Sequence, residues 1–535
     1  MRRLSLALGL VLFASPFVFF TACSVSSDPD GTGSGDGGNG GGFTPGSGGG
    51  GAGGPIRTCE EAAAAKAYIG CDFWPTVVAN NVWSIFDYAV VVANAGEEPV
   101  DVTVTRDGGE VATATIQPNQ LGTLYLPWVP ELKGPDFDAC TEVVPLSNTV
   151  KLPGGAYHLV STKPVTVYQF SALEYAAQGG PPGKDWSQCP ALQCGLECFS
   201  YSNDASLLLP STALTGNYRV TGLHGWELGD MGPYIAITGT QDNTNVAVKL
   251  AADGDIIGGG GVPSATGNGQ VNFTLQAGEV AELVGIPSSD FSGSLVQADK
   301  PVQVISGMPC TFIPEALGAC DHIEETVFPA ETLGRHYFLT VPTGLYGEPI
   351  GHLVRLYGNV NGTTLTYPGF KPPSAPTQIS AGQVVDLGIV TQDFEVLGDH
   401  EFGASMFQLG AEVVDPQNLI RGDPAQSVAI AVEQYRVKYV FLAPSDYDVN
   451  YVDVVQPLTA QLTLDGAAVA VAPIPISSDF GVAPVELGLG NGGAHVLTST
   501  APVGIQVLGY GSFTSYQYPG GSNLDTIAPP PEDVN

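Results

Sequence analysis

One strand pattern recurs several times along this chain, and it limits the folds that the sequence can adopt. Alternating apolar runs open on a proline motif at Lys163–Phe170, Lys300–Gly307 and Ala501–Leu508. Proline is tolerated at this place because the first residue of a strand need not donate a ladder hydrogen bond. Apolar residues that alternate with period two predict half-buried β-strands. Each run therefore indicates the closing strand of a β-unit.

Other strands precede these runs in a similar order. In each copy a second alternating strand is followed by Gly, Asn and Asp residues, which are typical of the turns of β-hairpins. The second strands are Asp87–Asn94, Pro233–Thr238, His352–Tyr357 and Asn450–Val455. An opening motif places an aromatic residue eight positions after a proline. Its examples are Pro75 with Trp83, Pro210 with Tyr218 and Pro329 with Tyr337, and we interpret the three prolines as equivalent positions.

The repeat predicts an all-β chain of tandem antiparallel β-sandwich-like repeats, in about four copies. The copies lie near 72–173, 205–310, 325–410 and 427–512. The composition agrees with this fold class, since 70 Gly and 42 Pro among 535 residues disfavour long helices. A β-propeller is the alternative, but its blades of about 40–50 residues are shorter than this period.

The first residues have the features of a targeting segment. Arg2 and Arg3 precede an apolar stretch, and Phe20-Thr21-Ala22-Cys23 resembles a bacterial lipoprotein signal. We expect cleavage before Cys23 and acylation of that residue. A membrane-spanning anchor is the alternative, but the apolar stretch is at the lower length limit for spanning. The glycine-rich segment that follows cannot bury enough apolar surface to order its backbone, so it predicts a disordered tether.

These patterns divide the chain into seven expected parts, with a tail that should fray because few apolar residues hold it. The parts are a signal peptide 1–22, a tether 23–57, β-unit 1 with a Cys-rich insertion 58–204, β-unit 2 205–324, β-unit 3 325–426, β-unit 4 427–520 and the tail 521–535.

Eight cysteines follow Cys23, and an even number in an exported chain predicts disulfides. The disulfide candidates are Cys59, Cys71, Cys140, Cys189, Cys194, Cys198, Cys310 and Cys320. Cys59 with Cys71 and Cys310 with Cys320 are the closest local pairs. Cys140 would pair within the cluster 189–198, in a connectivity that the sequence leaves open. A metal site in that cluster is the alternative, but its spacing is not Cys-x-x-Cys and no His is nearby.

The charge balance restricts the partners. Only 18 Lys and Arg oppose 53 Asp and Glu, which gives a formal net charge of −35. Nucleic acids bind through clustered Lys and Arg, so we expect no nucleic-acid partner. We expect membrane contact through the lipid anchor alone, no cofactor, and a protein or glycan ligand that is neutral or basic.

Three features of the chain resemble a known family. They are the Lys-Pro-Val motifs of the closing strands, the Leu-Pro and Phe-Pro motifs with their following tyrosines, and the cysteine-bearing first copy. They resemble the IgGFc-binding protein N-terminal domain family, over about residues 60–515. That family includes the amino-terminal region of a mucus-gel glycoprotein and many bacterial exported proteins and lipoproteins. The resemblance implies a binding function and brings no catalytic motif, and the family name implies antibody binding in the animal protein.

A search for catalytic and metal-binding patterns finds little. The sequence has no Gly-x-Ser-x-Gly elbow and no His-Glu-x-x-His motif. A weak Ca²⁺ candidate spaces its oxygen ligands at alternate positions, but it lacks the glycine and glutamate of the familiar loop, and a polar interstrand loop is the alternative. The candidate ligands are Asp446, Asp448, Asn450 and Asp453.

Three smaller motifs each have an ordinary explanation beside the functional one. Arg421-Gly422-Asp423 spells an adhesion tripeptide, which also arises by chance in turns. His322 and Glu324 could contribute metal ligands, or be ordinary loop residues. Trp186 and Trp226 lie in polar, Gly-rich segments and are the better candidates for exposed binding platforms.

These observations predict a lipid-anchored protein of a bacterial outer membrane or cell surface. We expect it to act as a non-enzymatic, multivalent binding or adhesion scaffold. One alternative is an exported hydrolase of surface glycans. Its carboxylate pair could not be located from sequence spacing, because such pairs are defined by distance in space. A purely structural envelope component is the other alternative.

Overall fold

The computed structural model describes residues 56–315, 320–488 and 493–531. The predicted signal peptide, Cys23 and nearly all of the predicted tether lie outside these residues. The elements are short helices and many strands, and the named strands all pair antiparallel. This confirms the predicted all-β fold of sandwich-like repeats. No helix in the described part of the chain is long and apolar enough to cross a membrane.

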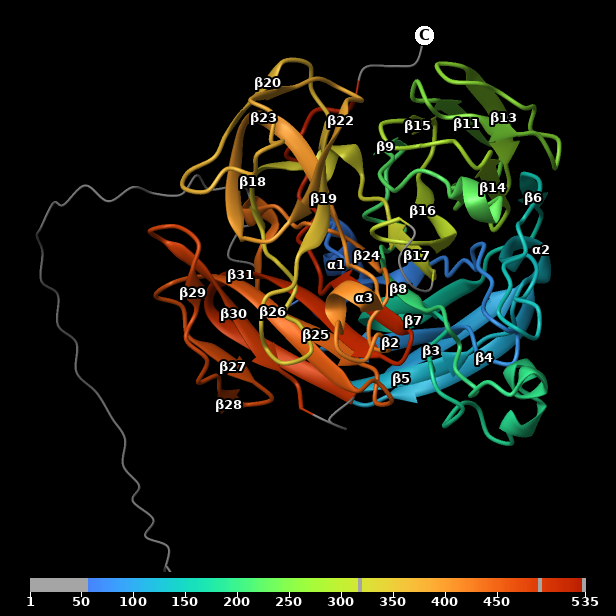
Figure 1. Ribbon diagram of the computed structural model, residues 1–535, viewed down its shortest axis with the longest axis horizontal. Coiled ribbons are helices and arrows are strands. Elements are labelled where there is room, and N and C mark those ends of the chain that lie inside the picture. Colours follow the sequence, from blue (N-terminus) through green and yellow to red (C-terminus); the bar gives the residue numbers. More distant parts are fainter. Residues whose placement is uncertain (1–55, 316–319, 489–492, 532–535) are drawn as a thin grey trace, which may run out of the picture. The chain divides into compact units, whose positions relative to one another are not determined.

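The strands fall into four units in chain order (Figure 1). Unit 1 consists of β1 (Gly70–Phe73), β2 (Ala89–Asn94), β3 (Val100–Arg106), β4 (Gly109–Ile116), β5 (Gln120–Tyr125), β7 (His158–Ser171) and β8 (Asp204–Leu208). Unit 2 consists of β9 (Asn217–Arg219), β10 (Tyr234–Gly239), β11 (Thr244–Lys249), β12 (Ile256–Ile257), β13 (Gln270–Leu275), β14 (Val280–Gly285), β15 (Leu295–Ala298), β16 (Val302–Thr311) and β17 (Asp321–Thr326).

Units 3 and 4 follow the same order. Unit 3 consists of β18 (Gly334–Leu339), β19 (His352–Gly358), β20 (Thr363–Thr366), β21 (Gln378–Ile379), β22 (Val384–Val390), β23 (Phe394–Phe407) and β24 (Gln426–Val428). Unit 4 consists of β25 (Arg436–Ala443), β26 (Val449–Pro457), β27 (Leu462–Leu464), β28 (Ala467–Ala468), β29 (Ile474–Pro475), β30 (Phe480–Glu486), β31 (Gly493–Gly511) and β32 (Thr514–Pro519). Outside the units lie β6 (Val150–Leu152), which pairs with β14, and the helices α1 (Cys59–Ala65), α2 (Pro130–Lys133) and α3 (Ala411–Val414).

One long strand organises each unit. The first half of β7 pairs with β1 and β3, and its second half pairs with β2 and β8. The strand thus belongs to two sheets, which enclose an apolar core between them. The strands β23 and β31 make the same pairs in units 3 and 4. In unit 2 the strand is interrupted at 299–301, so that β15 and β16 share its role.

The last strand of each unit neighbours the last strands of two others. Contacts run from β8 to β17, from β17 to β24, from β24 to β32 and from β32 back to β8. These closing strands pair with the long strand that precedes them in the sequence. The expected unit boundaries at 205, 325 and 427 each fall within or beside one of them.

The repeated aromatic position is Phe73, Tyr218, Tyr337 and Tyr439. Each of these residues lies on the first strand of its unit, opposite the first half of the long strand. Each tyrosine hydroxyl accepts from the backbone nitrogen three residues earlier and donates to a carbonyl of the long strand, which in unit 2 is the part formed by β16. The prediction that Trp83 fills this position is wrong, because the register assigns it to Phe73.

The predicted equivalence of the three prolines is also wrong for one of them. Pro210 follows β8 and packs against Gly70, and Pro329 follows β17 and bridges to Tyr218. Both therefore lie beyond a closing strand and beside the first strand of the same unit. Pro75 instead follows β1, where its carbonyl accepts from the backbone nitrogen of Tyr157. The common spacing to an aromatic residue arose from two different structural positions.

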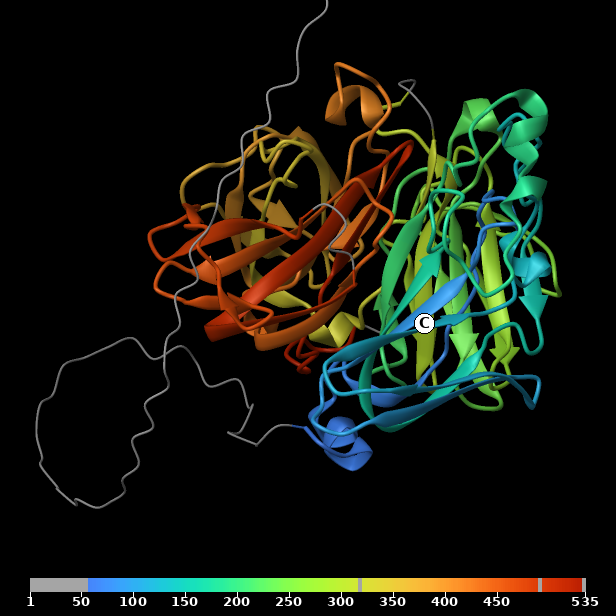
Figure 2. The ribbon, with the colours of Figure 1, turned by 90° about the horizontal axis from the view of Figure 1, so that it is seen from below.

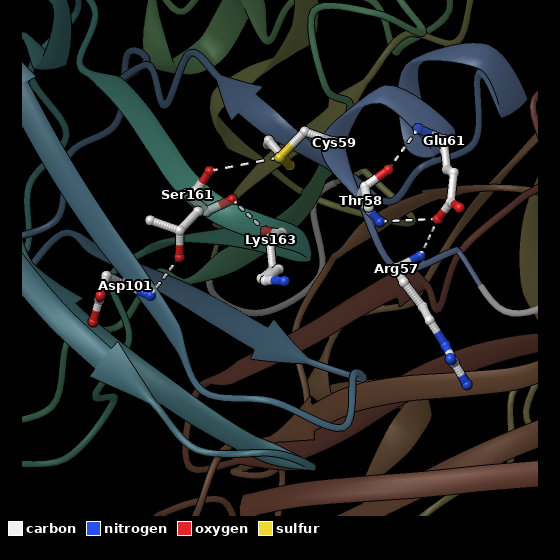
Figure 3. The surroundings of a disulfide bond; sticks show 9 residues. Arg57, Thr58, Cys59, Glu61, Asp101, Ser161 and Lys163 are labelled. Atoms are coloured by element: carbon white, nitrogen blue, oxygen red, sulfur yellow. Dashed lines mark hydrogen bonds between the residues drawn. A yellow bond between two sulfur atoms is a disulfide. The ribbon is translucent and has the colours of Figure 1, made fainter.

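Helix α1 attaches the start of the described chain to unit 1. Thr58 caps the helix by accepting from the backbone nitrogen of Glu61, whose carboxylate accepts from that of Thr58 (Figure 3). This reciprocal pair satisfies two amide groups that a helix start leaves open. A disulfide joins Cys59 of the helix to Cys71 of β1. The sulfur of Cys59 lies 3.8 Å from the carbonyl of Ser161 on β7.

The described part of the tail does not fray as expected. The backbone nitrogen of Asn523 donates to Gln434, and those of Ile527 and Ala528 both donate to Glu331. Leu524 is buried in an apolar cluster that unit 4 shares with units 1 and 3. Polar contacts, which composition does not reveal, hold this proline-rich segment against units 3 and 4.

Candidate functional site

The loops at the end of each long strand gather into one surface, which we call the loop face. It comprises the segments after the long strands and the segments that lead into each second strand, together with 134–144 of unit 1. The segments are 83–88, 134–144 and 172–203 in unit 1; 223–232 and 312–315 with Cys320 in unit 2; 343–350 and 408–422 in unit 3; and 444–448 and 512–513 in unit 4. Figure 2 shows α3, in orange, at the opposite end of the strands from α1, in blue.

Contacts across unit boundaries hold the loop face together. The backbone nitrogen of Tyr175 donates to the Asp446 carboxylate at 2.8 Å, which joins units 1 and 4. Arg421 of unit 3 pairs with Asp448 of unit 4 at 2.7 Å. The backbone nitrogen of Gly410 donates to a carbonyl of unit 2. Two shared apolar clusters lie beneath these contacts, so the four sets of loops form one supported surface.

Three disulfides stiffen this surface. They join Cys140 to Cys194, Cys189 to Cys198 and Cys310 to Cys320. The structure thereby selects one of the connectivities that the sequence left open for Cys140. The Cys140 bridge connects two loops that are 54 residues apart, so it fixes the insertion to the rest of unit 1.

Large apolar side chains on the loop face remain in water. Leu228 is 86 % exposed and Tyr346 is 64 % exposed, although each lies in a polar loop. Four further exposed side chains accompany them: Leu192, Leu196, Leu419 and Ile420. Trp186 and Trp226 are half-buried on the same face, where they pack on Phe86 and Phe312 respectively. Exposed apolar groups gathered at one end of a protein are typical of a binding surface.

The rim of the loop face is acidic. Its segments contain two basic side chains, Lys184 and Arg421, and each is paired with a carboxylate at 2.7 Å. The exposed acidic residues are Asp138, Glu142, Asp185, Glu197, Glu227, Asp230, Glu315 and Glu348. The face therefore combines apolar side chains with excess negative charge.

The structure does not bring the four side chains of the weak Ca²⁺ candidate together. Asp446 and Asp448 contact units 1 and 3, whereas Asp453 accepts two hydrogen bonds from Thr343. Asn450 accepts from the hydroxyl of Tyr516. Within residues 56–315, 320–488 and 493–531, no three His, Cys, Asp or Glu side chains are grouped to hold a metal ion.

The tripeptide Arg421-Gly422-Asp423 is not displayed as a ligand. Asp423 is fully buried, and its backbone nitrogen donates to Ser515 on β32. Gly422 has a φ of +91°, which turns the chain inward. Arg421 forms an ion pair with Asp448. The motif serves the packing of the loop, as expected for a chance occurrence.

Polar residues fill the centre between the closing strands. Glu324 accepts from Gln169 and Ser206 at 2.9 Å and pairs with His322 at 3.0 Å. His322 and Glu324 are fully buried, so this pair, predicted from sequence as possible metal ligands, is instead an internal hydrogen-bonded pair. Burial raises the pKa values of Asp204 and Asp321 well above the ordinary range. A polymeric substrate cannot reach these carboxylates.

Two further carboxylates, those of Glu174 and Asp446, lie at the edge of the loop face. Glu174 accepts from the hydroxyl of Tyr125 at 2.6 Å, and burial raises its pKa to about 7. Burial likewise raises the pKa of Asp446 to about 6. Both groups lie where the unit 1 insertion meets unit 4, so their ionisation bears on how the insertion is held.

The sequence did not identify the most exposed residues of this face. Leu228 lies among Gly, Glu and Asp, and Tyr346 lies between glycine-containing turns. Isolated apolar residues in such segments are common in buried loop anchors as well. No sequence signal separates the two cases, because exposure depends on which neighbouring loop covers the side chain.

Comparisons with known proteins find a human relative in sequence and two very low likenesses to solved structures. A human IgGFc-binding protein is 27 % identical over 325 residues, which is 58 % of this chain and 6 % of the human protein. Two solved structures of anti-sigma factor domain-containing proteins, the second from Clostridium clariflavum, show 8 % and 10 % identity at TM-scores of 0.10 and 0.11. The alignments cover 55 % and 80 % of this chain and 83 % and 99 % of those chains, and likenesses this low carry no structural information.

A family profile also matches this chain. It covers residues 204–509, from the closing strand of unit 1 into the long strand of unit 4, and leaves most of unit 1 outside. The match spans more than half of the chain and includes the Leu-Pro, Phe-Pro and Lys-Pro-Val motifs. The chain belongs to the IgGFc binding protein family.

Proposed function

We propose that this protein is a lipid-anchored surface protein that binds another protein through the loop face, without catalysis. The observation that carries the proposal is the set of six large apolar side chains exposed at that face, led by Leu228 and Tyr346. Burying a leucine or aromatic side chain on a partner gains about 1.5–3 kcal/mol relative to leaving it in water. The disulfides favour such binding, since a pre-ordered surface loses little conformational entropy when it docks.

The partner's chemistry follows from the rim. Exposed carboxylates surround the apolar residues, and both basic side chains of the face are already paired. A complementary partner presents an apolar centre with cationic residues around it. The human relative is named for binding the Fc part of IgG, so a purified Fc fragment is a suitable first probe.

The anchor and tether complete the proposal. A lipid on Cys23 would hold the protein at a bacterial surface, and the glycine-rich tether would let the body move over tens of ångströms. Four disulfides are expected in an oxidising compartment outside the cytoplasm. Several anchored copies could then engage one large partner together, with affinity gained from their effective concentration.

Site-specific photo-crosslinking on intact producing cells tests the proposal. A photoreactive residue at position 228 or 346 should crosslink to one defined protein, while the same residue at Ile474, an apolar position outside the face that is 55 % exposed, should not. Leu228→Asp should weaken binding of the identified protein or of the Fc fragment about tenfold, and Ile474→Asp should leave it unchanged. Equal crosslinking from all three positions would refute the proposal.

A further inference from the structure

The outer face of unit 2 holds an open hollow of about 610 Å³. It lies on the sheet formed by β13, β11, β15 and β9. Four residues cross the sheet in direct register: Asn217, Gln297, Ala247 and Asn272. Directly opposed residues share one face of an antiparallel sheet, so three amide side chains flank one small residue. The hollow is wide open to solvent, so a ligand would lie along the face of the sheet.

The other units have a different row at the same register. Where unit 2 has Ala247, units 1, 3 and 4 have Thr103, Thr366 and Thr463. Where unit 2 has Gln297, they have Val160, Leu397 and Thr498. A β-branched residue at the centre occupies the space that alanine leaves open. The hollow and its amides are thus specific to unit 2 and are not a general property of the repeat.

The polar groups around the hollow are held in place by one another. The Asn217 amide donates to Glu331 at 2.7 Å, and Gln297 donates to Asn217 at 3.3 Å. On the next row, Asn245 donates to Asp299 at 2.8 Å and accepts from Thr274 at 3.0 Å. An amide side chain carries two donors and two acceptor lone pairs, so the two internal bonds of Asn217 and of Asn245 fix their orientation and leave further hydrogen-bonding capacity for a ligand.

We propose that this hollow binds a neutral carbohydrate chain. Sugar hydroxyls are both donors and acceptors, and amide side chains match both roles. Phe273 lies opposite the buried Val246 and packs against the core of unit 2, so the amide side chains supply the contacts to the sugar. Asp299 is the one charged residue in the lining, and it would repel carboxylated or sulfated sugars. No lysine or arginine lines the hollow, so an anionic ligand lacks a partner there.

Isothermal titration of the full chain tests this site. The probes are neutral homo-oligosaccharides of glucose, galactose, mannose, xylose and N-acetylglucosamine, with polygalacturonate as an anionic comparison. At least one neutral probe should bind at millimolar concentration, and polygalacturonate should not. Ala247→Thr should weaken that binding tenfold or more. This variant installs the residue of the other three units, and threonine suits a strand, so folding is expected to persist.

Matched variants distinguish the outcomes. Gln297→Thr should also weaken binding, whereas Thr463→Ala, at the same register in unit 4, should not. The loop-face variant Leu228→Asp should leave carbohydrate binding intact, so failure of one proposal is separable from failure of the other. Absence of binding by every neutral probe, unchanged binding by Ala247→Thr, or equal binding of polygalacturonate would each overturn the proposal.

Discussion

The carboxylate of Asp204 accepts a hydrogen bond of 3.0 Å from the backbone nitrogen of Gln426, 222 residues further along the chain. The same oxygen accepts from the backbone nitrogen of Glu324. One side chain on β8 thus joins the closing strands of units 1, 2 and 3. The sandwiches are therefore connected by polar contacts at the centre, in addition to the chain itself.

Replacing Asp204 should loosen this connection. Asp204→Ala leaves buried N–H groups without an acceptor, and each such group costs about 1–3 kcal/mol. We expect a loss of roughly 3 kcal/mol in the free energy of unfolding, measured by chemical denaturation. Asp253→Ala, at an exposed loop position, is the control. Equal stability of the two variants would contradict a structural role for Asp204.

Removing the hydroxyl of one repeated tyrosine should lower the free energy of unfolding by less than the loss of Asp204 does. Tyr337→Phe removes the hydroxyl that accepts from Gly334 and donates to Phe402. The loss should be about 1–2 kcal/mol, since phenylalanine fills the same space but satisfies neither partner. Tyr346→Phe, on the exposed loop face, should change the unfolding midpoint very little. A Tyr337→Phe protein as stable as the wild type would show that solvent replaces the hydroxyl.

Glu174 predicts a dependence of stability on pH. Burial raises its pKa from 4.5 to about 7 in the folded chain. Between these values the folded chain keeps a proton that the unfolded chain releases, so the stability contributed below pH 4.5 is lost as pH rises through 7. Glu174→Gln should be roughly 3 kcal/mol more stable than wild type at pH 8 and equal to it at pH 4. Glu110→Gln, at an exposed position, should show no such crossover.

The two disulfides of the insertion should differ in their effect. Cys140→Ser/Cys194→Ser opens a loop of 54 residues, and Cys189→Ser/Cys198→Ser opens one of 9. Loop-closure entropy predicts losses of about 4 and about 2.5 kcal/mol respectively. Limited proteolysis should cut the first variant faster within 172–203. The reverse order of stabilities would show that native contacts, and not the cross-link, hold the insertion.

Cys23 carries the prediction on anchoring. Cys23→Ser should move the protein from the membrane fraction to the soluble exported fraction, because the acyl chains would be missing. Mass spectrometry of the wild-type amino terminus should find a diacylated or triacylated cysteine. An unmodified wild-type terminus that begins before residue 23 would refute the lipoprotein hypothesis.

The local pattern was sufficient to predict the strands and their fold class. Alternating runs such as Lys300–Gly307 indicate burial of one or both faces, and proline at their start is compatible only with a strand end or edge. The same kind of spacing misassigned Pro75 and Trp83, because a proline before an aromatic residue occurs in loops as well as beside strands. Register, which is set by pairing with a distant strand, was needed to choose Phe73.

The sequence by itself determined the all-β architecture, its repetition and the likeness to a binding family, since these depend on periodicities that each segment carries alone. The tertiary structure decided which residues are available for function. Leu228 is exposed because no neighbouring loop covers it, and Ala247 lines a hollow because three amides from other strands surround it. Both facts follow from the packing of segments far apart in the chain, which no local pattern encodes.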